Sequence, residues 1–333
     1  MQIFRFIIKL ISLFIKVLSP KNKKKTEKAV TATTPKASDR IPETLKQSET
    51  ETVSADPSVL AAVAALKRNG IIIETDVGEA ELPDESKIGG LPYLPADFVW
   101  PTFTDEEGVT RPLSFLCQIK LDEVTELDSE HLLPETGILA FFYDCASFRW
   151  GFDPADRGCA RVYYFENMDG FIPHAIPEDI SDEYKIPAMP LVCTETVDCY
   201  PVFDEASVLG EFDCDWDAYD AAREELGVTE EEERHLMLGY ADVIQNEMLT
   251  ECEYVTRGIY RGDATASEAL TDEERAEIAE AAKDWVLLLQ MSTVEKDGYE
   301  LMWGDCGMLY FYIKKEDLAA RRFENAWFAL QCF

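Results

Sequence analysis

Two apolar stretches near the end of the chain decide the fold: residues 287–290 have the sequence LLLQ, and residues 302–313 have the sequence MWGDCGMLYFYI. They are typical of two buried strands, the first ending on a glutamine and the second following a glycine. The same pattern occurs earlier, as FLCQ at residues 115–118 and GILAFFY at residues 137–143. The number of residues between the glutamine and the glycine that follows it is nearly equal in the two places. The sequence therefore predicts an internal duplication.

Other short strands follow one another along the chain. Runs at residues 71–75, 161–165 and 191–197 are rich in β-branched and aromatic residues. Consecutive short strands without intervening helices favour antiparallel pairing. The predicted fold class is α+β, with mostly antiparallel sheets built from a duplicated unit and a few peripheral helices.

The sequence contains fewer helix signals than strand signals. Residues 57–69 follow a capping aspartate, and Gly70 is expected to end that helix. Thr-x-x-Glu capping boxes begin at Thr229 and Thr271, and Asp297-Gly298 marks a turn. Further helices are expected at residues 216–226, 229–237, 271–283 and 316–325.

Charge is unevenly distributed. Residues 1–58 carry 11 Lys and Arg against 6 Asp and Glu, a net of +5, whereas the whole chain has a formal net charge of −34. The remaining body therefore carries −39. So acidic a body repels nucleic acid and anionic lipid, and it attracts basic polypeptides at long range. Solubility alone is the alternative reason for this charge.

The N-terminal residues 1–25 have the pattern of an amphipathic membrane anchor. Arg5, Lys9 and Lys16 fall on one narrow face of a helix, and the remaining surface is almost entirely apolar, with Phe14 as one of its large side chains. The lysine cluster that follows favours anionic headgroups and keeps the body on the cytoplasmic side. A short spanning anchor and a cleaved signal peptide are the alternatives.

Composition divides the chain into three segments. After the anchor, residues 26–55 are polar, lack aromatics and are expected to form a disordered linker. Residues 56–333 form the folded body. The duplication divides this body into related halves at about residues 56–200 and 201–333.

The nine cysteines show no C-x-x-C motif, and their odd number argues against a disulfide framework. Cys117 and Cys145 lie inside apolar runs, which favours buried thiols in a reducing compartment. A zinc site at Cys193 and Cys199 is the alternative, although zinc sites usually show tighter pairs. The sequence thus predicts neither a metal nor a cofactor.

A rigid, irregular loop covers residues 87–101. Gly89 and Gly90 permit backbone angles closed to other residues, and three prolines stiffen the segment after them. Tyr93 and Trp100 lie on this loop. Such aromatic loops occur at binding sites, and packing against the sheet is the alternative role.

No catalytic constellation is recognisable. The chain has three histidines and contains no P-loop, G-x-G-x-x-G or H-E-x-x-H motif. Gln118 and Gln290 stand out, because a glutamine that closes an apolar strand needs hydrogen-bond partners from a neighbouring loop or a ligand backbone. The candidate binding residues are Gly89, Gly90, Pro92, Tyr93, Trp100, Gln118, Gln245, Gln290, Trp303 and Asp305.

Several of these segments resemble the signature of the YwqG-like family of bacterial proteins. They are Ile88–Pro95 with Trp100-Pro101, residues 112–119, Leu238-Gly239-Tyr240 with Gln245, and the two stretches quoted first. The resemblance covers about residues 57–333 and brings no established activity with it.

The core of that family is similar, more remotely, to the eukaryotic programmed-cell-death-two family, whose members escort a newly made ribosomal protein. The resemblance implies a polypeptide-binding module. This chain departs from many eukaryotic relatives by lacking their paired zinc-ligating cysteines.

We therefore expect a non-catalytic module that binds a polypeptide, with a basic one favoured by charge, and that is attached to the cytoplasmic face of a membrane through residues 1–25. One alternative is an enzyme of unknown reaction that uses dispersed acidic residues together with Gln118 or Gln290. The other is a small-molecule sensor.

Overall fold

The computed structural model describes residues 55–75, 78, 82–228, 234–262, 265–266 and 269–333. These residues belong to one compact unit, and the anchor predicted at residues 1–25 lies outside them. Among the described residues, no helix is both long enough and apolar enough to cross a membrane.

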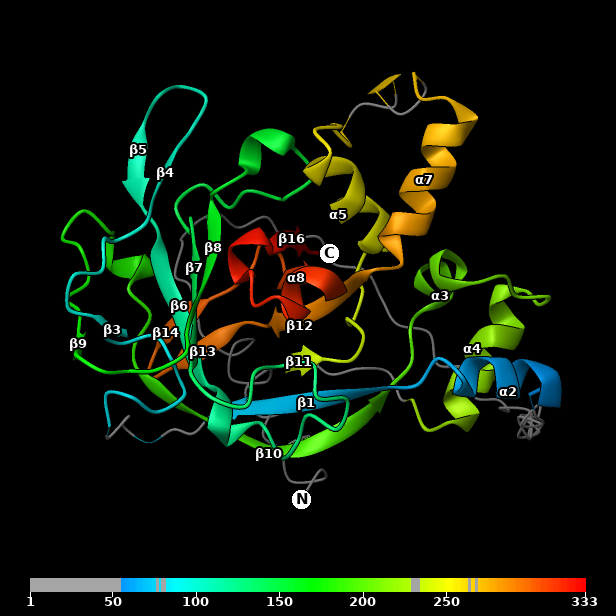
Figure 1. The fold of residues 1–333 in the computed structure, drawn as a ribbon, viewed down its shortest axis with the longest axis horizontal. Coiled ribbons are helices and arrows are strands. Elements are labelled where there is room, and N and C mark those ends of the chain that lie inside the picture. Colours follow the sequence, from blue (N-terminus) through cyan, green and yellow to red (C-terminus); the bar gives the residue numbers. More distant parts are fainter. Residues whose placement is uncertain (1–54, 76–77, 79–81, 229–233, 263–264, 267–268) are drawn as a thin grey trace, which may run out of the picture. The chain divides into compact units, whose positions relative to one another are not determined.

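One ten-stranded sheet organises this unit (Figure 1). Every neighbouring pair in it is antiparallel, which confirms the predicted α+β, mostly antiparallel fold. The strand order is β16 (Trp327–Gln331), β15 (Met308–Lys314), β12 (Trp285–Met291), β11 (His235–Leu238), β1 (Arg68–Thr75), β10 (Met189–Cys199), β2 (Lys87–Ile88), β6 (Ser114–Lys120), β7 (Ile138–Tyr143) and β8 (Ala160–Phe165).

The sheet repeats the same arrangement on both sides of its centre. The order β1-β11-β12-β15-β16 on one side matches β10-β2-β6-β7-β8 on the other. Both glutamine strands carry a register shift just before the glutamine, between Phe115 and Cys117 in β6 and between Leu287 and Leu289 in β12. The strand order and the matching irregularity are consistent with the predicted duplication.

Two residues with left-handed backbone angles lie at the end of each short strand. Gly89 and Gly90 follow β2 with φ of 61° and 68°. Leu238, the last residue of β11, and Gly239 after it have φ of 58° and 69°. A side chain at Gly89 would place its Cβ 2.4 Å from the carbonyl oxygen of Ile186. Position 89 must therefore be a glycine, because its backbone conformation and the space around it both exclude a side chain.

Each glutamine of the repeated pattern is fully buried and binds three groups around it. The Gln118 Oε1 accepts a hydrogen bond from the Tyr93 amide at 2.9 Å, and its Nε2 donates to the carbonyl oxygens of Pro83 and Glu85 at 2.9 and 2.8 Å. These bonds join β6 to the segment before β2 and to the loop after it. We call a buried glutamine with its three partners a glutamine bridge.

The second glutamine bridge has the same layout. Gln290 Oε1 accepts from the Asp242 amide at 2.8 Å, and Nε2 donates to the Arg234 carbonyl oxygen at 3.1 Å and to Asp242 Oδ2 at 2.7 Å. Asp242 follows Gly239 at the same spacing as Tyr93 follows Gly90. The two bridges are therefore equivalent parts of the duplicated unit.

The main core lies between the inner faces of the two repeats. Phe141 of β7 packs against Phe311 of β15 with ring centroids 5.1 Å apart, although the strands lie near opposite ends of the sheet order. The Leu330 amide also donates to the Trp150 carbonyl oxygen at 2.9 Å. The sheet thus curls until its ends approach each other.

Helices, short turns and small hairpins surround the sheet (Figure 1). The helices are α2 (Pro57–Ala64), α3 (Phe203–Leu209), α4 (Trp216–Glu225), α5 (Leu249–Thr256), α7 (Asp272–Ala282) and α8 (Lys315–Ala319). The 3₁₀ turns are η1 (Leu121–Glu123), η2 (Pro154–Asp156), η3 (Asp182–Tyr184) and η4 (Phe323–Asn325). The two-stranded sheets pair β3 (Tyr93–Pro95) with β9 (Phe171–Pro173), β4 (Thr102–Thr104) with β5 (Thr110–Pro112), and β13 (Val294–Lys296) with β14 (Tyr299–Leu301).

Two predicted features are confirmed. Thr271 and Glu274 form the expected reciprocal capping box at the start of α7. Asp297-Gly298 forms the turn between β13 and β14. In addition, no disulfide joins any of the nine cysteines.

Three helix boundaries were predicted wrongly. The first helix ends at Ala64, and Gly70 lies inside β1, where its lack of a side chain leaves room for Cys199. Residues 235–238 form β11 instead of a helix, since their backbone pairs with β1. The predicted helix at residues 316–325 is divided into α8 and η4 by Arg321, which has a φ of 59°. The capping box predicted at Thr229 lies outside the described residues.

We predict that replacing either buried glutamine destabilises the fold. Gln290→Leu deprives the Asp242 amide and the Arg234 carbonyl of their bridge partner in the interior, and Gln118→Leu has the same effect at Tyr93. Each change should lower the free energy of unfolding by about 2–4 kcal/mol. Urea denaturation at pH 7 measures this loss.

Gln245→Leu is the matched control, because the side chain of Gln245 is exposed and makes one hydrogen bond. It should cost under about 1 kcal/mol. Equal losses of unfolding free energy in all three variants would mean that the glutamine bridges stabilise the fold no more than the single hydrogen bond of Gln245 does.

Candidate functional site

The structure distributes the predicted site residues over three places: one around each glutamine bridge, and an open depression that includes Gln245. In the first loop, Pro92 is buried and its carbonyl oxygen accepts from the His174 amide at 2.9 Å. Trp100 is half-buried, donates its indole N–H to the Leu113 carbonyl oxygen at 2.8 Å and packs edge-on against Phe142. Gly89 and Gly90 shape this loop, and its aromatic side chains pack against neighbouring strands.

The loop nevertheless leaves apolar side chains at the surface. Val99 is 84% exposed, and Leu91 and Ile172 of β9 are also exposed. Tyr93 is half-buried and contacts the ring of Phe171. This side of the molecule therefore has scattered apolar contact area around a stiff backbone.

In the second repeat, Trp303 is fully buried. Its indole N–H donates to the Ser292 carbonyl oxygen at 3.0 Å, and its ring lies against Tyr143. Asp305 is exposed, and its carbonyl oxygen accepts from the Phe333 amide at 3.0 Å. The Trp303 ring thus packs in the core and presents no surface to a partner in this structure.

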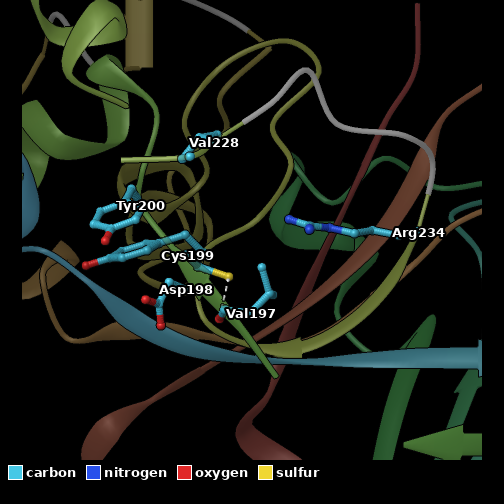
Figure 2. A pocket seen from close by; sticks show the side chains of 8 residues that line it. Val197, Asp198, Cys199, Tyr200, Val228 and Arg234 are labelled. Atoms are coloured by element: carbon cyan, nitrogen blue, oxygen red, sulfur yellow. Dashed lines mark hydrogen bonds between the residues drawn. The ribbon is translucent and has the colours of Figure 1, made fainter. Parts of the chain in front are cut away.

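A small cavity of about 80 Å³ lies beside the central strands (Figure 2). In it, Cys199 Sγ donates to the Val197 carbonyl oxygen, while Arg234 forms a two-bond ion pair with Asp242 at 2.8 Å. Such a volume holds only a few water molecules. Its lining residues are Val197, Asp198, Cys199, Tyr200, Gly227, Val228, Arg234 and Tyr240.

A larger, open depression of about 560 Å³ lies at the start of α5. Its residues come from the segment before η2, from the start of α3, from the loop before α5, from the first turn of α5 and from the segment after α5. We call it the acidic depression, and it is lined by Phe152, Asp204, Gln245, Asn246, Glu247, Glu251, Arg261 and Gly262. It includes Gln245, one of the residues predicted from sequence.

A third buried glutamine fixes the wall of the acidic depression. Gln331, at the end of β16, accepts from the amides of Ile244 and Gln245 at 3.0 and 3.1 Å and donates to the Asn246 carbonyl oxygen at 2.7 Å. Gln245 in turn donates to the Cys332 carbonyl oxygen at 2.7 Å. Gln331 was not among the residues predicted from sequence, although it too ends an apolar strand.

Carboxylates outnumber cations in the acidic depression. Asp204, Glu247 and Glu251 face one cation, Arg261, whose guanidinium stacks over the Tyr254 ring at 4.5 Å. Because like charges repel at short range, a site with three carboxylates and one guanidinium favours a cationic ligand.

Two carboxyls at this place hold their protons unusually tightly. Burial raises the pKa of Glu205, which follows Asp204 in α3, to about 8, with Arg68 opposing the shift and Glu247 adding to it. Burial also raises the pKa of Glu251 to about 7, with Arg261 opposing the shift. Carboxyls of this kind can bind a cation when ionised or donate a proton when neutral.

The described residues contain no set of side chains arranged as metal ligands. No group of three or more His, Cys, Asp or Glu side chains there has the geometry to hold a metal ion. Cys193 of β10 is half-buried, and burial raises the pKa of its thiol to about 12.

A protein-family model described as a domain of unknown function (DUF1963) matches residues 86–332. That range includes both glutamine bridges and the acidic depression, and it is consistent with the YwqG-like resemblance. None of the curated proteins matches the chain.

We predict that Glu205 makes stability depend on pH. Its folded-state pKa of about 8 lies above the ordinary value of 4.5, so its contribution is fully present below about pH 4.5 and is lost as the pH rises through about 8. Glu205→Gln removes this loss. The variant should be more stable than wild type at pH 9, by on the order of a few kcal/mol, and nearly equal at pH 5.

Urea denaturation at pH 5, 7 and 9 checks this difference. Glu273→Gln, at an exposed position of α7, changes the net charge equally and should show no such trend. A Glu205→Gln difference that stays constant with pH would contradict the account.

Proposed function

We propose, from the premise that this chain belongs to the DUF1963 family of domains of unknown function, that it is a non-catalytic module that binds a basic polypeptide. The acidic depression carries the proposal. It is open, it is large enough to admit side chains, and its carboxylates outnumber its single arginine. Lysine and arginine side chains are the protein groups complementary to it.

Two wider features support a polypeptide partner. The net charge of −39 after residue 58 would steer a basic chain toward the surface and would disfavour nucleic acid. The stiff first loop, with exposed Leu91 and Val99, offers apolar contact area at low entropic cost.

The resemblances stated above agree with this proposal. The YwqG-like resemblance suggests a bacterial source. The remote similarity to the programmed-cell-death-two family suggests an escort for a basic polypeptide, since members of that family escort a newly made ribosomal protein. Such a role requires a binding site, and it requires neither a cofactor nor a catalytic group.

We also propose that residues 1–25 attach the module to the cytoplasmic face of a membrane. The cationic stripe of Arg5, Lys9 and Lys16, the apolar surface that includes Phe14, and the lysines that follow support this attachment. The linker at residues 26–55 would then allow the folded body to extend away from the membrane surface.

An enzyme is the second candidate, and the raised pKa values of Glu205 and Glu251 favour it. Carboxyls that titrate near neutral pH often act as general acids or bases. An open, strongly negative depression suits the binding of a cation better than enclosure of a small substrate, so binding remains the preferred function.

We predict that the full-length chain binds an unstructured peptide rich in Lys and Arg and ignores a peptide in which these residues are Asp and Glu. At pH 8, where Glu251 is mostly ionised, removing two charges with Asp204→Asn and Glu251→Gln should weaken the binding about tenfold, because two attractive partners are lost. Isothermal titration calorimetry at low and moderate salt measures the affinities.

The matched control is Asp272→Asn with Glu273→Gln, which removes two charges from the exposed start of α7. It should leave the affinity nearly unchanged. The proposal fails if the basic peptide does not bind, or if both double variants behave alike.

We predict that reversing the cationic stripe detaches the protein from membranes. Full-length protein with Arg5→Glu, Lys9→Glu and Lys16→Glu should move to the soluble fraction, because the anionic headgroups then repel the helix. Lys28→Glu, Lys36→Glu and Lys46→Glu in the linker form the control and should stay with the membrane fraction. Equal partitioning of the two triple variants would rule out the stripe as the anchor.

A further inference from the structure

A second open depression, of about 380 Å³, lies at the other end of α5. The acidic depression takes residues from the first turn of this helix, whereas the second one takes them from its last turn, from the start of β12 and from the end of β15. Three cations, Arg157, Arg257 and Lys314, line this one space, although the body carries a net charge of −39. We call it the arginine depression.

A buried carboxylate in its wall holds two of these cations. Glu253 is only 1% exposed, and its Oε1 accepts from Arg257 Nε at 2.6 Å. Its Oε2 accepts from Lys314 Nζ at 2.7 Å and from the Trp285 indole N–H at 2.9 Å. Burial opposes ionisation of Glu253, but the hydrogen bonds from Lys314, Arg257 and Trp285 outweigh it and lower the pKa. Both oxygens of this carboxylate are therefore engaged.

The two arginines are fixed, yet each keeps N–H groups for a ligand. Arg257 is bound through Nε, so its Nη1 and Nη2 have no partner among the described residues. Arg157 donates from Nη2 to the Thr256 carbonyl oxygen at 3.2 Å, and its guanidinium lies over the Trp327 ring, 5.2 Å from the centroid. Both side chains are exposed. A guanidinium held on one side presents its remaining N–H groups in set directions.

The carboxylates of the arginine depression do not use up these cations. Asp317 Oδ1 accepts from Arg322 Nε at 2.7 Å and from Asn325 Nδ2 at 2.9 Å. Glu316 is exposed to solvent. With Arg322 included, four cations face three carboxylates, which leaves a local charge of +1: Arg157, Arg257, Lys314 and Arg322 against Glu253, Glu316 and Asp317. This balance suits a monoanion.

We propose that the arginine depression binds one carboxylate group between Arg157 and Arg257, with Lys314 adding positive charge. This site goes beyond the proposed function and does not depend on the acidic depression. A carboxylate is planar, and its two oxygens accept parallel N–H bonds from a guanidinium. A phosphate dianion would be repelled more strongly by Glu316.

The end of α5 is a partly unfavourable place for an anion, because the carbonyl end of a helix is negative. The helix has only eight residues, however, and Arg157 already donates to one of its last carbonyl oxygens. The guanidinium groups therefore dominate the field in the arginine depression.

The test uses the full-length protein and four peptides with acetylated N-termini. Three have amidated C-termini and the sequence Gly-Gly-X-Gly-Gly, in which X is Glu, Gln or phosphoserine, and the fourth is pentaglycine with a free C-terminal carboxylate. The Glu peptide or pentaglycine should bind about tenfold or more tightly than the Gln peptide, because only these two carry a carboxylate. The tighter of the two identifies a side chain or a chain end as the source. Tightest binding of the phosphoserine peptide would overturn the assignment to a carboxylate.

Binding is followed through the indole N–H signals in nuclear magnetic resonance spectra. The Trp285 signal should shift, because this group donates to the carboxylate that holds Arg257. The signal of Trp216, which is exposed at the start of α4, should stay in place. An unmoved Trp285 signal, or equal shifts of both signals, would contradict binding at the arginine depression.

Arg157→Gln and Arg257→Gln should each weaken binding of the carboxylate peptide about tenfold or more. Arg157→Lys keeps the charge but loses the planar fork, so it should also weaken binding, by about threefold or more. Lys67→Gln, which removes a charge from an exposed ion pair with Asp198, is the control and should leave the affinity nearly unchanged. Because the Arg157 side chain is exposed, its variants keep the test valid even where Arg257→Gln fails to fold.

The outcomes separate this site from the proposed function. Equal weakening in Lys67→Gln and Arg157→Gln would mean that overall charge alone attracts the peptide, and it would overturn the site. Failure of both carboxylate peptides to bind would also overturn it. Either result would leave the basic-polypeptide function standing, since that function uses the acidic depression.

Discussion

The buried glutamine amides impose the constraint on which the rest of the fold depends. An amide in an apolar interior must find partners for its oxygen and its two N–H groups, because an unpaired one costs about 1–3 kcal/mol. Gln118 and Gln290 meet this requirement by binding backbone before and after a short strand. That strand can be brief because its ends are fixed. The left-handed residues that follow it turn the chain back to the glutamine, which explains why glycines occur there.

Much of this frame could be predicted from the sequence. Hydrophobic runs that end in glutamine predict the strands, because a buried strand has a strong local signature. The repetition of these runs predicts the duplication. Gly70 was misjudged because a glycine after a helical pattern usually ends a helix, whereas here β10 and β11 pack against it. Residues 235–238 are a strand only because β1 lies beside them. Such effects come from distant partners that no local pattern records.

The candidate site was less predictable than the fold. Gln245 was predicted, but Gln331 and Glu205 were not. Gln331 ends an apolar strand as Gln118 and Gln290 do, so the signal that marks them could have found it. Glu205 is one acidic residue among many, and no spacing distinguishes it. Trp303 appeared on a turn and so suggested an exposed aromatic, whereas the curled sheet places its ring against Tyr143 in the core. The amino-acid composition predicts an acidic surface. The gathering of its carboxylates around α5 depends on the loop that Gln331 holds.

The central claim, that two equivalent glutamine bridges hold the duplicated fold, is tested most directly by hydrogen exchange at single amides. The amide of Tyr93 lies at the start of the three-residue strand β3 and that of Asp242 lies in a loop, yet each donates to a buried glutamine oxygen. The account predicts that both exchange as slowly as amides in the central strands and far more slowly than the amide of exposed Val99. Exchange of either amide at the rate of Val99 would contradict it.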